Sequence, residues 1–263
     1  MGGDAGTARR APDEPPAGVR GRPAGRPLCR LTPLLLAAAL SAVGCVAPPP
    51  GAGPSARLSQ PPNVGDAKRA ATAYHDSGGY ARDLAAVAAQ ASAWLARRAP
   101  GTRNPVLVLD IDETSLSNWE VILADDFGRI IGGPCPALPE GPCGWAAWDL
   151  LARSRAIAPT LGLFRQARAL GVAVVFITGR PESQREATER NLRAEGYEGW
   201  ARLVMVPDGA RFASAAAFKA PVRAGLEREG HTIVANLGDQ PSDLEGGHAE
   251  RAFLLPNPFY RIP

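Results

Sequence analysis

The chain has 263 residues, which is enough for one large domain or two small domains with an ample core. Its formal net charge is +3, but the first 45 residues contain six of the 29 lysines and arginines and only three of the 26 acidic residues. The rest of the chain is formally neutral, so the charge balance argues against a nucleic-acid polymer as a partner.

Residues 1–45 have the pattern of an export leader. A basic region precedes an apolar centre at residues 34–40 that is too short to span a bilayer stably. Gly44-Cys45 then resembles the end of a bacterial lipobox, although Ala42 stands where leucine is commoner. Lipidation of Cys45 would make the membrane a partner and place the protein in the outer membrane or periplasm of a Gram-negative bacterium. Ordinary signal cleavage is the alternative.

A tether and a helical segment follow the leader. Residues 46–63 are rich in proline, glycine and serine, which predicts an extended linker without a core. The domain itself is expected over residues 64–263. It begins with two alanine-rich helices between residues 67 and 98, separated near Ser77-Gly78-Gly79.

The most informative stretch is Val106 to Trp119. Four aliphatic residues run directly into Asp110 and Asp112, as expected of a strand buried on both faces whose carboxyl end meets a ligand crevice. One carboxylate can form an aspartyl-phosphate, the second can transfer a proton, and a divalent cation can offset their charge. A strand end with solvated turn acids is the alternative.

Residues 116–156 form a long excursion after this strand. They contain Trp119, Trp145 and Trp148, and also Cys135 and Cys143. In an oxidising compartment the two cysteines can close a small loop through a disulfide. A metal site is the alternative, but no histidine lies near them.

The remaining pattern alternates helices and strands. Helices are predicted over residues 158–170, 182–195 and 214–229, and strands over 172–177, 203–206, 232–237 and 251–255. Thr178-Gly179-Arg180 follows one strand, Lys219 lies on the third helix, and Asp239 and Asp243 follow another strand. Lys219 is notable because the whole sequence has only one other lysine, Lys68, against 27 arginines. A compact ammonium suits a point contact to phosphate.

These motifs, in this order, resemble those of the haloacid dehalogenase superfamily, and Asp-Ile-Asp-Glu-Thr resembles its secreted acid phosphatases of bacterial lipoprotein and plant type. The resemblance implies an α/β Rossmann-like three-layer sandwich with a parallel sheet and a small cap at residues 116–156. It also implies hydrolysis of phosphate monoesters with Mg²⁺ as cofactor. Asp110 would be the nucleophile, Asp112 the general acid and then base, and Thr178 and Lys219 the groups that hold the phosphoryl oxygens.

The same resemblance assigns the cation to the Asp110 carboxylate, the Asp112 backbone carbonyl and Asp239, with Asp243 acting through a second shell or water. Two other functions stay open. One is phosphotransfer to an alcohol through the same intermediate. The other is a non-catalytic storage role, as in plant relatives that tend to lose the nucleophile, which is intact here. The oligomeric state is not predicted.

Aromatic residues suggest a substrate class. Trp119 lies nine residues after the nucleophile, and the segment around Tyr260 resembles the part of the lipoprotein phosphatases that reaches substrate. Stacking on such rings would hold a nucleobase, so we expect Trp119 or Tyr260 to line a site for nucleoside monophosphates. Core packing is the alternative for each ring. Arg180 is a candidate substrate ligand, with a salt bridge as its alternative role.

Overall fold

The computed structural model describes residues 61–136 and 138–262. The predicted leader, its lipidation site Cys45 and most of the tether therefore lie outside the described residues. Within the described part, every helix is too short or too polar to cross a membrane.

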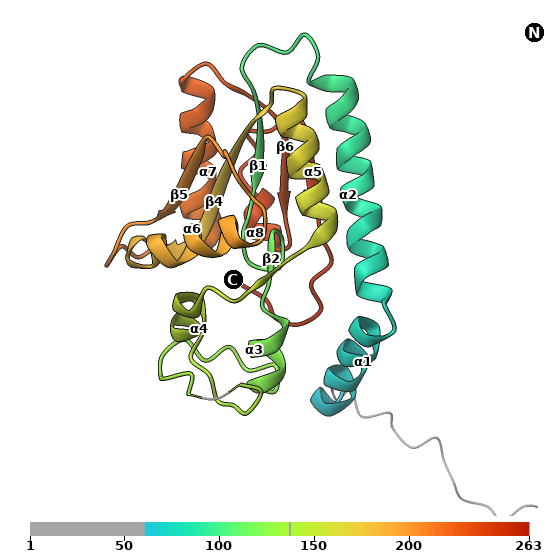
Figure 1. The fold of residues 1–263 in the computed structure, drawn as a ribbon, viewed down its shortest axis with the longest axis vertical. Coiled ribbons are helices and arrows are strands. Elements are labelled where there is room, and N and C mark those ends of the chain that lie inside the picture. Colours follow the sequence, from blue (N-terminus) through green and yellow to red (C-terminus); the bar gives the residue numbers. More distant parts are fainter. Residues whose placement is uncertain (1–60, 137, 263) are drawn as a thin grey trace, which may run out of the picture. The chain divides into compact units, whose positions relative to one another are not determined.

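A five-stranded parallel sheet forms the centre of the domain (Figure 1), with the strand order β5-β4-β1-β6-β7. The strands are β1 (Pro105–Leu109), β4 (Ala173–Pro181), β5 (Arg202–Val206), β6 (Thr232–Gly238) and β7 (Ala252–Leu254). The middle strand is β1, and its residues 106–109 are all buried. A strand covered on both faces has no polar face, which explains its uninterrupted aliphatic run.

Helices cover both faces of the sheet and make three layers. On one face, α2 (Gly79–Arg98) and α5 (Ala158–Ala169) pack in the cluster that includes Leu107 and Leu109. On the other, α7 (Ala215–Arg228) contributes Phe218 and Leu226 to a cluster with Val106 and Val108. The fold is therefore the predicted α/β Rossmann-like sandwich with a parallel sheet.

The insertion predicted at residues 116–156 is bounded by a two-stranded antiparallel pair, β2 (Leu116–Ser117) and β3 (Arg155–Ala156). Between them lie α3 (Trp119–Ala124) and α4 (Trp145–Leu151), below the carboxyl ends of the strands in Figure 1. A disulfide joins Cys135 to Cys143 in this insertion, which we call the cap. The backbone N–H of Cys143 donates to Asp125 at 2.6 Å and fixes the same loop.

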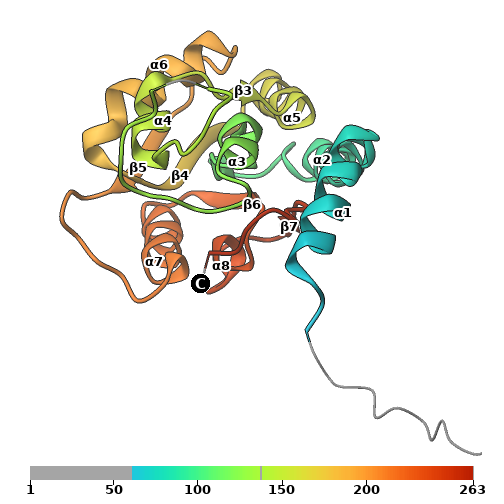
Figure 2. The same ribbon diagram turned by 90° about the horizontal axis from the view of Figure 1, so that it is seen from below.

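The first helix, α1 (Val64–Asp76), lies beside the cap (Figure 2). Its His75 ring stacks on Trp119 with 3.7 Å between the ring centroids. His75 thus joins the amino-terminal helix to the cap.

Two predicted elements differ in extent from those observed. The strand expected at residues 172–177 continues as β4 through Pro181, because Pro181 still pairs with Val206 of β5. The helix expected at residues 182–195 begins as a 3-10 turn, Glu182–Gln184, before α6 (Arg185–Ala194). The remaining short helix, α8 (Pro241–Leu244), follows β6 directly.

Candidate active site

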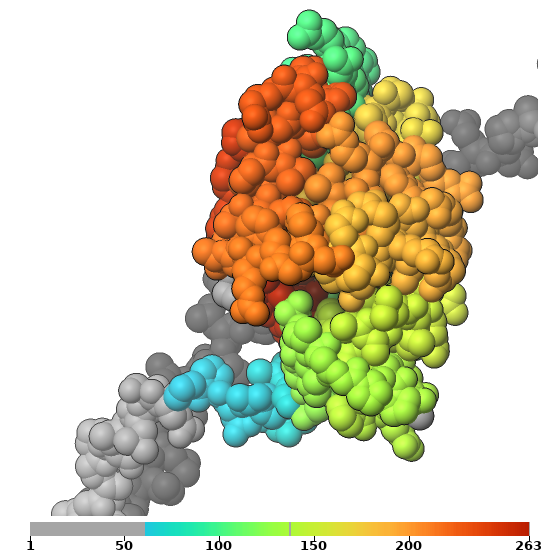
Figure 3. Space-filling model, turned by 90° about the vertical axis from the view of Figure 1, so that its left-hand side faces the viewer, coloured from blue at the N-terminus to red at the C-terminus, as the bar shows by residue number. Residues whose placement is uncertain are grey.

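A cavity of about 380 Å³ lies at the carboxyl edge of the sheet, between the cap and the segment that leads into α7. Figure 3 shows the opening between these parts, with the carboxyl-terminal segment in red at its floor. Asp110 and Asp112 reach the cavity from the end of β1, and Asp239 and Asp243 reach it from the end of β6 and from α8. The parallel order of the sheet thus brings together acids that are more than a hundred residues apart.

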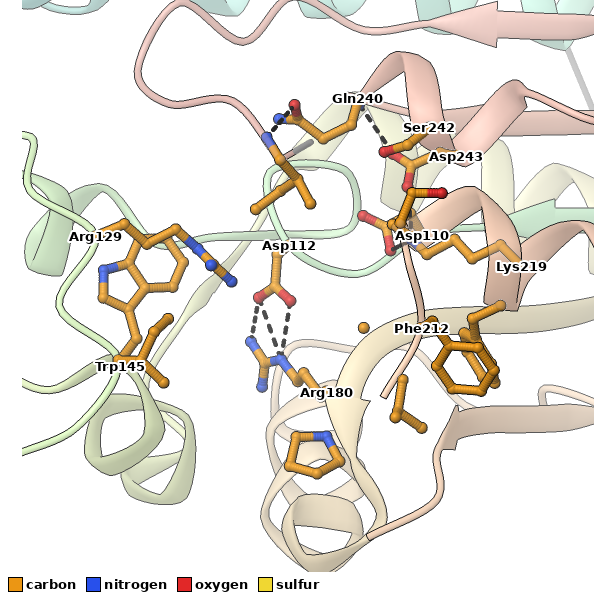
Figure 4. A pocket seen from close by; sticks show the side chains of 18 of the residues that line it. Asp110, Asp112, Arg129, Trp145, Arg180, Phe212, Lys219, Gln240, Ser242 and Asp243 are labelled. Carbon is orange, nitrogen blue, oxygen red and sulfur yellow. Dashed lines mark hydrogen bonds and ion pairs between the residues drawn. The ribbon is translucent and has the colours of Figure 1, made fainter. Parts of the chain in front are cut away.

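Three buried carboxylates form the centre of the site. Oxygen atoms of Asp110, Asp239 and Asp243 all lie within 4.8 Å of one another. The Lys219 ammonium group donates to Asp110 at 2.5 Å and to Asp243 at 2.6 Å (Figure 4). One ammonium cannot balance three carboxylates in a water-poor site, so the cluster retains excess negative charge. A hard divalent cation with oxygen ligands would neutralise it.

The protonation of these groups reflects that excess. Burial raises the pKa of Asp110 well above its ordinary value, and the carboxylates of Asp243 and Asp239 add to the rise, while Lys219 opposes it. Burial and Asp243 likewise raise the pKa of Asp239 to about 7. For Lys219 burial lowers the pKa, but Asp110 and Asp243 outweigh it and keep the ammonium charged. The site therefore favours a bound cation, because without one its carboxylates tend to take up protons.

Neighbouring amides fix the direction of the acids after β6. Asp239 accepts hydrogen bonds from the side-chain amides of Gln240 and Asn257, both at 2.6 Å. Asp243 accepts from the backbone N–H of Gln240 at 2.9 Å. Gly238 is required here, since a Cβ atom at that position would lie 2.4 Å from the Cβ of Asp243. The close approach of β6 and α8 is what aims both carboxylates at Asp110.

Asp112 lies apart from this cluster, on the cap side of the cavity. Its carboxylate accepts from the Arg180 guanidinium at 2.6 and 3.1 Å and from the Asn118 amide at 2.9 Å. Burial alone would raise the pKa of Asp112, but the charge and hydrogen bonds of Arg180 and the bond from Asn118 lower it overall. Arg180 also lies 3.1 Å from Asp149 of α4. Arg180 thus lines the cavity in the salt-bridge role that the sequence left open.

Thr178 lies in the last part of β4 and is completely buried. Its hydroxyl accepts from the backbone N–H of Arg180 at 3.1 Å. Gly179, between the two, lines the cavity. The motif therefore presents its backbone to the cavity, with the threonine hydroxyl directed along the turn.

Comparison with known proteins identifies the family. The family model described as HAD superfamily, subfamily IIIB (Acid phosphatase) matches residues 62–263. The chain belongs to this family. HAD abbreviates the haloacid dehalogenase superfamily, so the resemblance carried by the sequence motifs is confirmed.

Relatives in plants share part of the chain. A stem 28 kDa glycoprotein of Glycine max is 36% identical over 59% of this chain and 59% of its own length. Vegetative storage protein 1 of Arabidopsis thaliana is 30% identical over 60% of this chain and 56% of its own. Acid phosphatase 1 of Solanum lycopersicum is 32% identical over 60% of this chain and 59% of its own. The chain thus matches somewhat under three fifths of the length of these curated relatives.

Two solved structures resemble the fold of this chain. The class C acid phosphatase of Bacillus anthracis with tungstate bound superposes with a TM-score of 0.59 at 22% identity, over 74% of this chain and 85% of that chain. A second structure of the same protein gives a TM-score of 0.58 at 21% identity. At this identity the likeness shows a shared fold and nothing beyond it.

Several aromatic residues of the chain are placed differently from the prediction. Trp119 does not line the cavity; it packs against His75 and against Phe259, whose ring centroid is 5.0 Å away. Trp148 is buried in the core. Trp145 and Tyr260 do line the cavity, with ring centroids 5.2 Å apart in an edge-to-face arrangement. Of the two rings predicted for a base site, Tyr260 therefore lines the cavity and Trp119 does not, because the Trp119 ring stacks on His75 of α1.

Sequence reasoning missed several residues of the site. The most connected is Asn118, whose amide donates to Asp112 and whose carbonyl accepts from the Trp148 indole at 2.8 Å and the Ser154 hydroxyl at 2.9 Å. The others include Glu113, which accepts from the Tyr260 hydroxyl and is raised in pKa to about 7 mainly by burial. Arg129, Asp149 and Phe212 also line the cavity. A signal for Asn118 was its place at the end of the motif stretch, directly before the first helix of the cap.

Proposed function

We propose that the chain hydrolyses phosphate monoesters through an aspartyl-phosphate on Asp110. The observation that carries the proposal is the buried cluster in which Asp110 meets Asp239, Asp243 and Lys219 at the carboxyl edge of the sheet. Asp110 is paired with an ammonium group, and a cation held by the surrounding acids would keep its carboxylate ionised as a nucleophile and neutralise the incoming phosphate. Family membership supports the same chemistry.

The reaction divides into two steps. In the first, an Asp110 oxygen attacks phosphorus, the bond from phosphorus to the ester oxygen breaks, and Asp112 releases to the departing alcohol the proton that it took up from water in the preceding turnover, a release that its lowered pKa favours. In the second, Asp112 takes a proton from water, whose oxygen attacks phosphorus and releases phosphate and free Asp110. Arg180 and Asn118 hold the Asp112 carboxylate for both steps. Lys219 and the turn at Thr178-Gly179, where Gly179 lines the cavity, bind the phosphoryl oxygens, where charge must be stabilised in the transition state.

A divalent cation fits the donor set, because the cluster offers only hard oxygen ligands and carries excess negative charge. We assign it to Mg²⁺, held by the carboxylates of Asp110 and Asp239 and the backbone carbonyl of Asp112, with Asp243 in support. When bound, the cation supplies positive charge that draws the phosphate and the nucleophile together.

A storage function is the second candidate, favoured by the name of the vegetative storage protein among the relatives. Against it stands the intact arrangement of Asp110, Asp112 and Lys219, which storage alone does not need. Phosphotransfer to an alcohol would use the same aspartyl-phosphate, and product analysis with an added alcohol separates it from hydrolysis.

For the substrate, nucleoside monophosphates remain our proposal, with Tyr260 and its neighbour Trp145 as the base-contacting rings. For the location we propose export. The lipid anchor at Cys45 lies outside the described residues, and the outer-membrane location gains no support from relatives that are plant proteins.

The test uses the full chain and its Asp110→Asn variant with phenyl phosphate and Mg²⁺. The amide has nearly the shape of the carboxylate but is a poor nucleophile, so the variant should stay folded and lose turnover. A wild-type protein without turnover would favour the storage function. A folded variant that retains substantial activity would contradict the proposed nucleophile.

A further inference from the structure

One cation at the cavity makes no ion pair with the acids of the proposed reaction, although its charge helps to lower the pKa of Asp112. Arg129 lies in the cap loop between α3 and α4 and lines the cavity. Its guanidinium carbon lies 5.4 Å from the centroid of the Trp145 ring. Figure 4 shows the guanidinium directed from the cap wall toward the interior of the cavity, on the side of Asp112. An indole ring beside a flat guanidinium limits its positions and leaves N–H groups free to donate.

The ion pairs of the cavity single out Arg129. Three cations line it, and two of them each contact two carboxylates: Lys219 contacts Asp110 and Asp243, and Arg180 contacts Asp112 and Asp149. Among the described residues, no carboxylate lies within 4 Å of the Arg129 guanidinium. Its hydrogen-bonding capacity toward an anion is therefore available to a ligand.

We propose that Arg129 binds a second anionic group on the substrate, so that a phosphate monoester whose leaving alcohol also carries a phosphate or a carboxylate, a nucleoside bisphosphate included, is preferred over the matched monoester without that group. This inference rests on the proposed function, since it assigns the leaving-group side of the same cavity. A phosphate that reacts with Asp110 would have its ester oxygen on the side of Asp112, the proposed proton donor, and Arg129 lines the cavity on that same side (Figure 4). The forked guanidinium matches the geometry of a carboxylate or phosphate.

A structural role for Arg129 makes a different prediction. Arg129 would then serve only as a distant counter-charge to Asp112 and Asp149, which together face the single charge of Arg180. In that case its loss would change the turnover of every substrate by the same factor. The subsite predicts instead a loss confined mainly to substrates with the second anion.

The experiment compares matched substrates with and without the second anion. The pairs are phenyl phosphate with para-carboxyphenyl phosphate, glycerol phosphate with phosphoglycerate, and glycerol phosphate with glycerol bisphosphate. The proteins are the full wild-type chain, Arg129→Gln and Arg129→Lys. Arg153→Gln is the control, because Arg153 is an exposed cap arginine that pairs with Glu120 and does not line the cavity.

We expect the wild type to prefer the substrate with the second anion by roughly tenfold in kcat/KM, as a charged hydrogen bond is able to provide. Arg129→Gln should abolish this preference, Arg129→Lys should keep part of it, and Arg153→Gln should keep all of it. A preference within the two carboxylate pairs alone, or within the phosphate pair alone, supports the subsite and identifies its anion. Equal losses on both members of every pair, or no preference in the wild type, would overturn the inference.

A binding measurement separates this inference from the proposed reaction. Benzylphosphonate and para-carboxybenzylphosphonate are not hydrolysed, so calorimetric titration with each of them measures the preference for the second anion as a ratio of two Kd values, without turnover. A tighter Kd for the carboxylate analogue that Arg129→Gln removes would support the subsite even if phosphatase activity failed. Equal Kd values for the two analogues in the wild type would contradict it even if the enzyme were active.

Discussion

Asn118→Ala tests whether one buried amide joins the cap to the proposed proton-transfer residue. Asn118 is completely buried, and its side chain makes four hydrogen bonds: to Asp112 and Glu113 as donor, and from Trp148 and Ser154 as acceptor. Alanine removes all four. The two donors left behind are themselves buried, and Trp148 has a fixed indole N–H with no other hydrogen-bond partner in the described structure.

The magnitude follows from those donors. A buried polar group that loses its partner costs about 1–3 kcal/mol, and the Ser154 hydroxyl is able to rotate whereas the indole is not. We therefore expect the free energy of unfolding to fall by about 2–4 kcal/mol, which for a domain of this size lowers Tm by roughly 4–16 °C. Urea unfolding of wild type and variant measures this difference directly.

The activity of Asn118→Ala provides a second test, because Asp112 also loses a hydrogen bond in this variant. A misplaced proton donor matters most when the leaving alcohol is poor, so kcat for an alkyl phosphate should fall by roughly tenfold or more beyond the fall for para-nitrophenyl phosphate. Ser154→Ala is the matched control, since it leaves the bonds of Asn118 to Asp112 and Trp148 intact. An Asn118→Ala protein as stable as Ser154→Ala, with no dependence on the leaving group, would refute this role.

Three further predictions concern the cation, the cap and the aromatic rings. Exhaustive chelation should abolish activity and added Mg²⁺ should restore it, because the three carboxylates of the cluster need charge compensation; unchanged activity in chelator would contradict the metal site. Replacing Cys135 and Cys143 by serine should remove about 2–3 kcal/mol of stabilisation that closing the loop provides, and should speed amide hydrogen exchange in the cap. Unchanged exchange would show that the disulfide does not rigidify the cap. Tyr260→Ala should raise KM for nucleoside monophosphates far more than KM for phenyl phosphate. Trp119→Ala should lower the stability of the protein and leave the ratio of these two KM values unchanged. A change in KM for nucleotides alone in Trp119→Ala would contradict the packing role of Trp119.

The sequence predicted the sheet and the order of its acids because both depend on local pattern. A short aliphatic run that ends in Asp110 predicts a buried strand, and so does the apolar run that precedes Asp239. The extension of β4 beyond residue 177 to Pro181 depends instead on pairing with β5, a strand that follows β4 in the chain only after α6.

Side-chain direction in the cap was not predictable in the same way. Trp119 is close to Asp110 in sequence, but its ring direction is set by His75 and Phe259, which come from opposite ends of the domain. Two partners of Asn118, Trp148 and Ser154, likewise lie 30 and 36 residues further along the chain. Such contacts follow from tertiary packing, which leaves no periodic signal in the sequence.

The most direct test of the proposed mechanism is to identify the covalent intermediate. The full chain is mixed with excess phenyl phosphate and Mg²⁺, quenched in acid during turnover, digested and analysed by mass spectrometry. The mechanism predicts a phosphate mass on the peptide that contains Asp110, absent from the Asp110→Asn variant. Steady turnover with no phosphorylated Asp110, or phosphate on another residue, would contradict it.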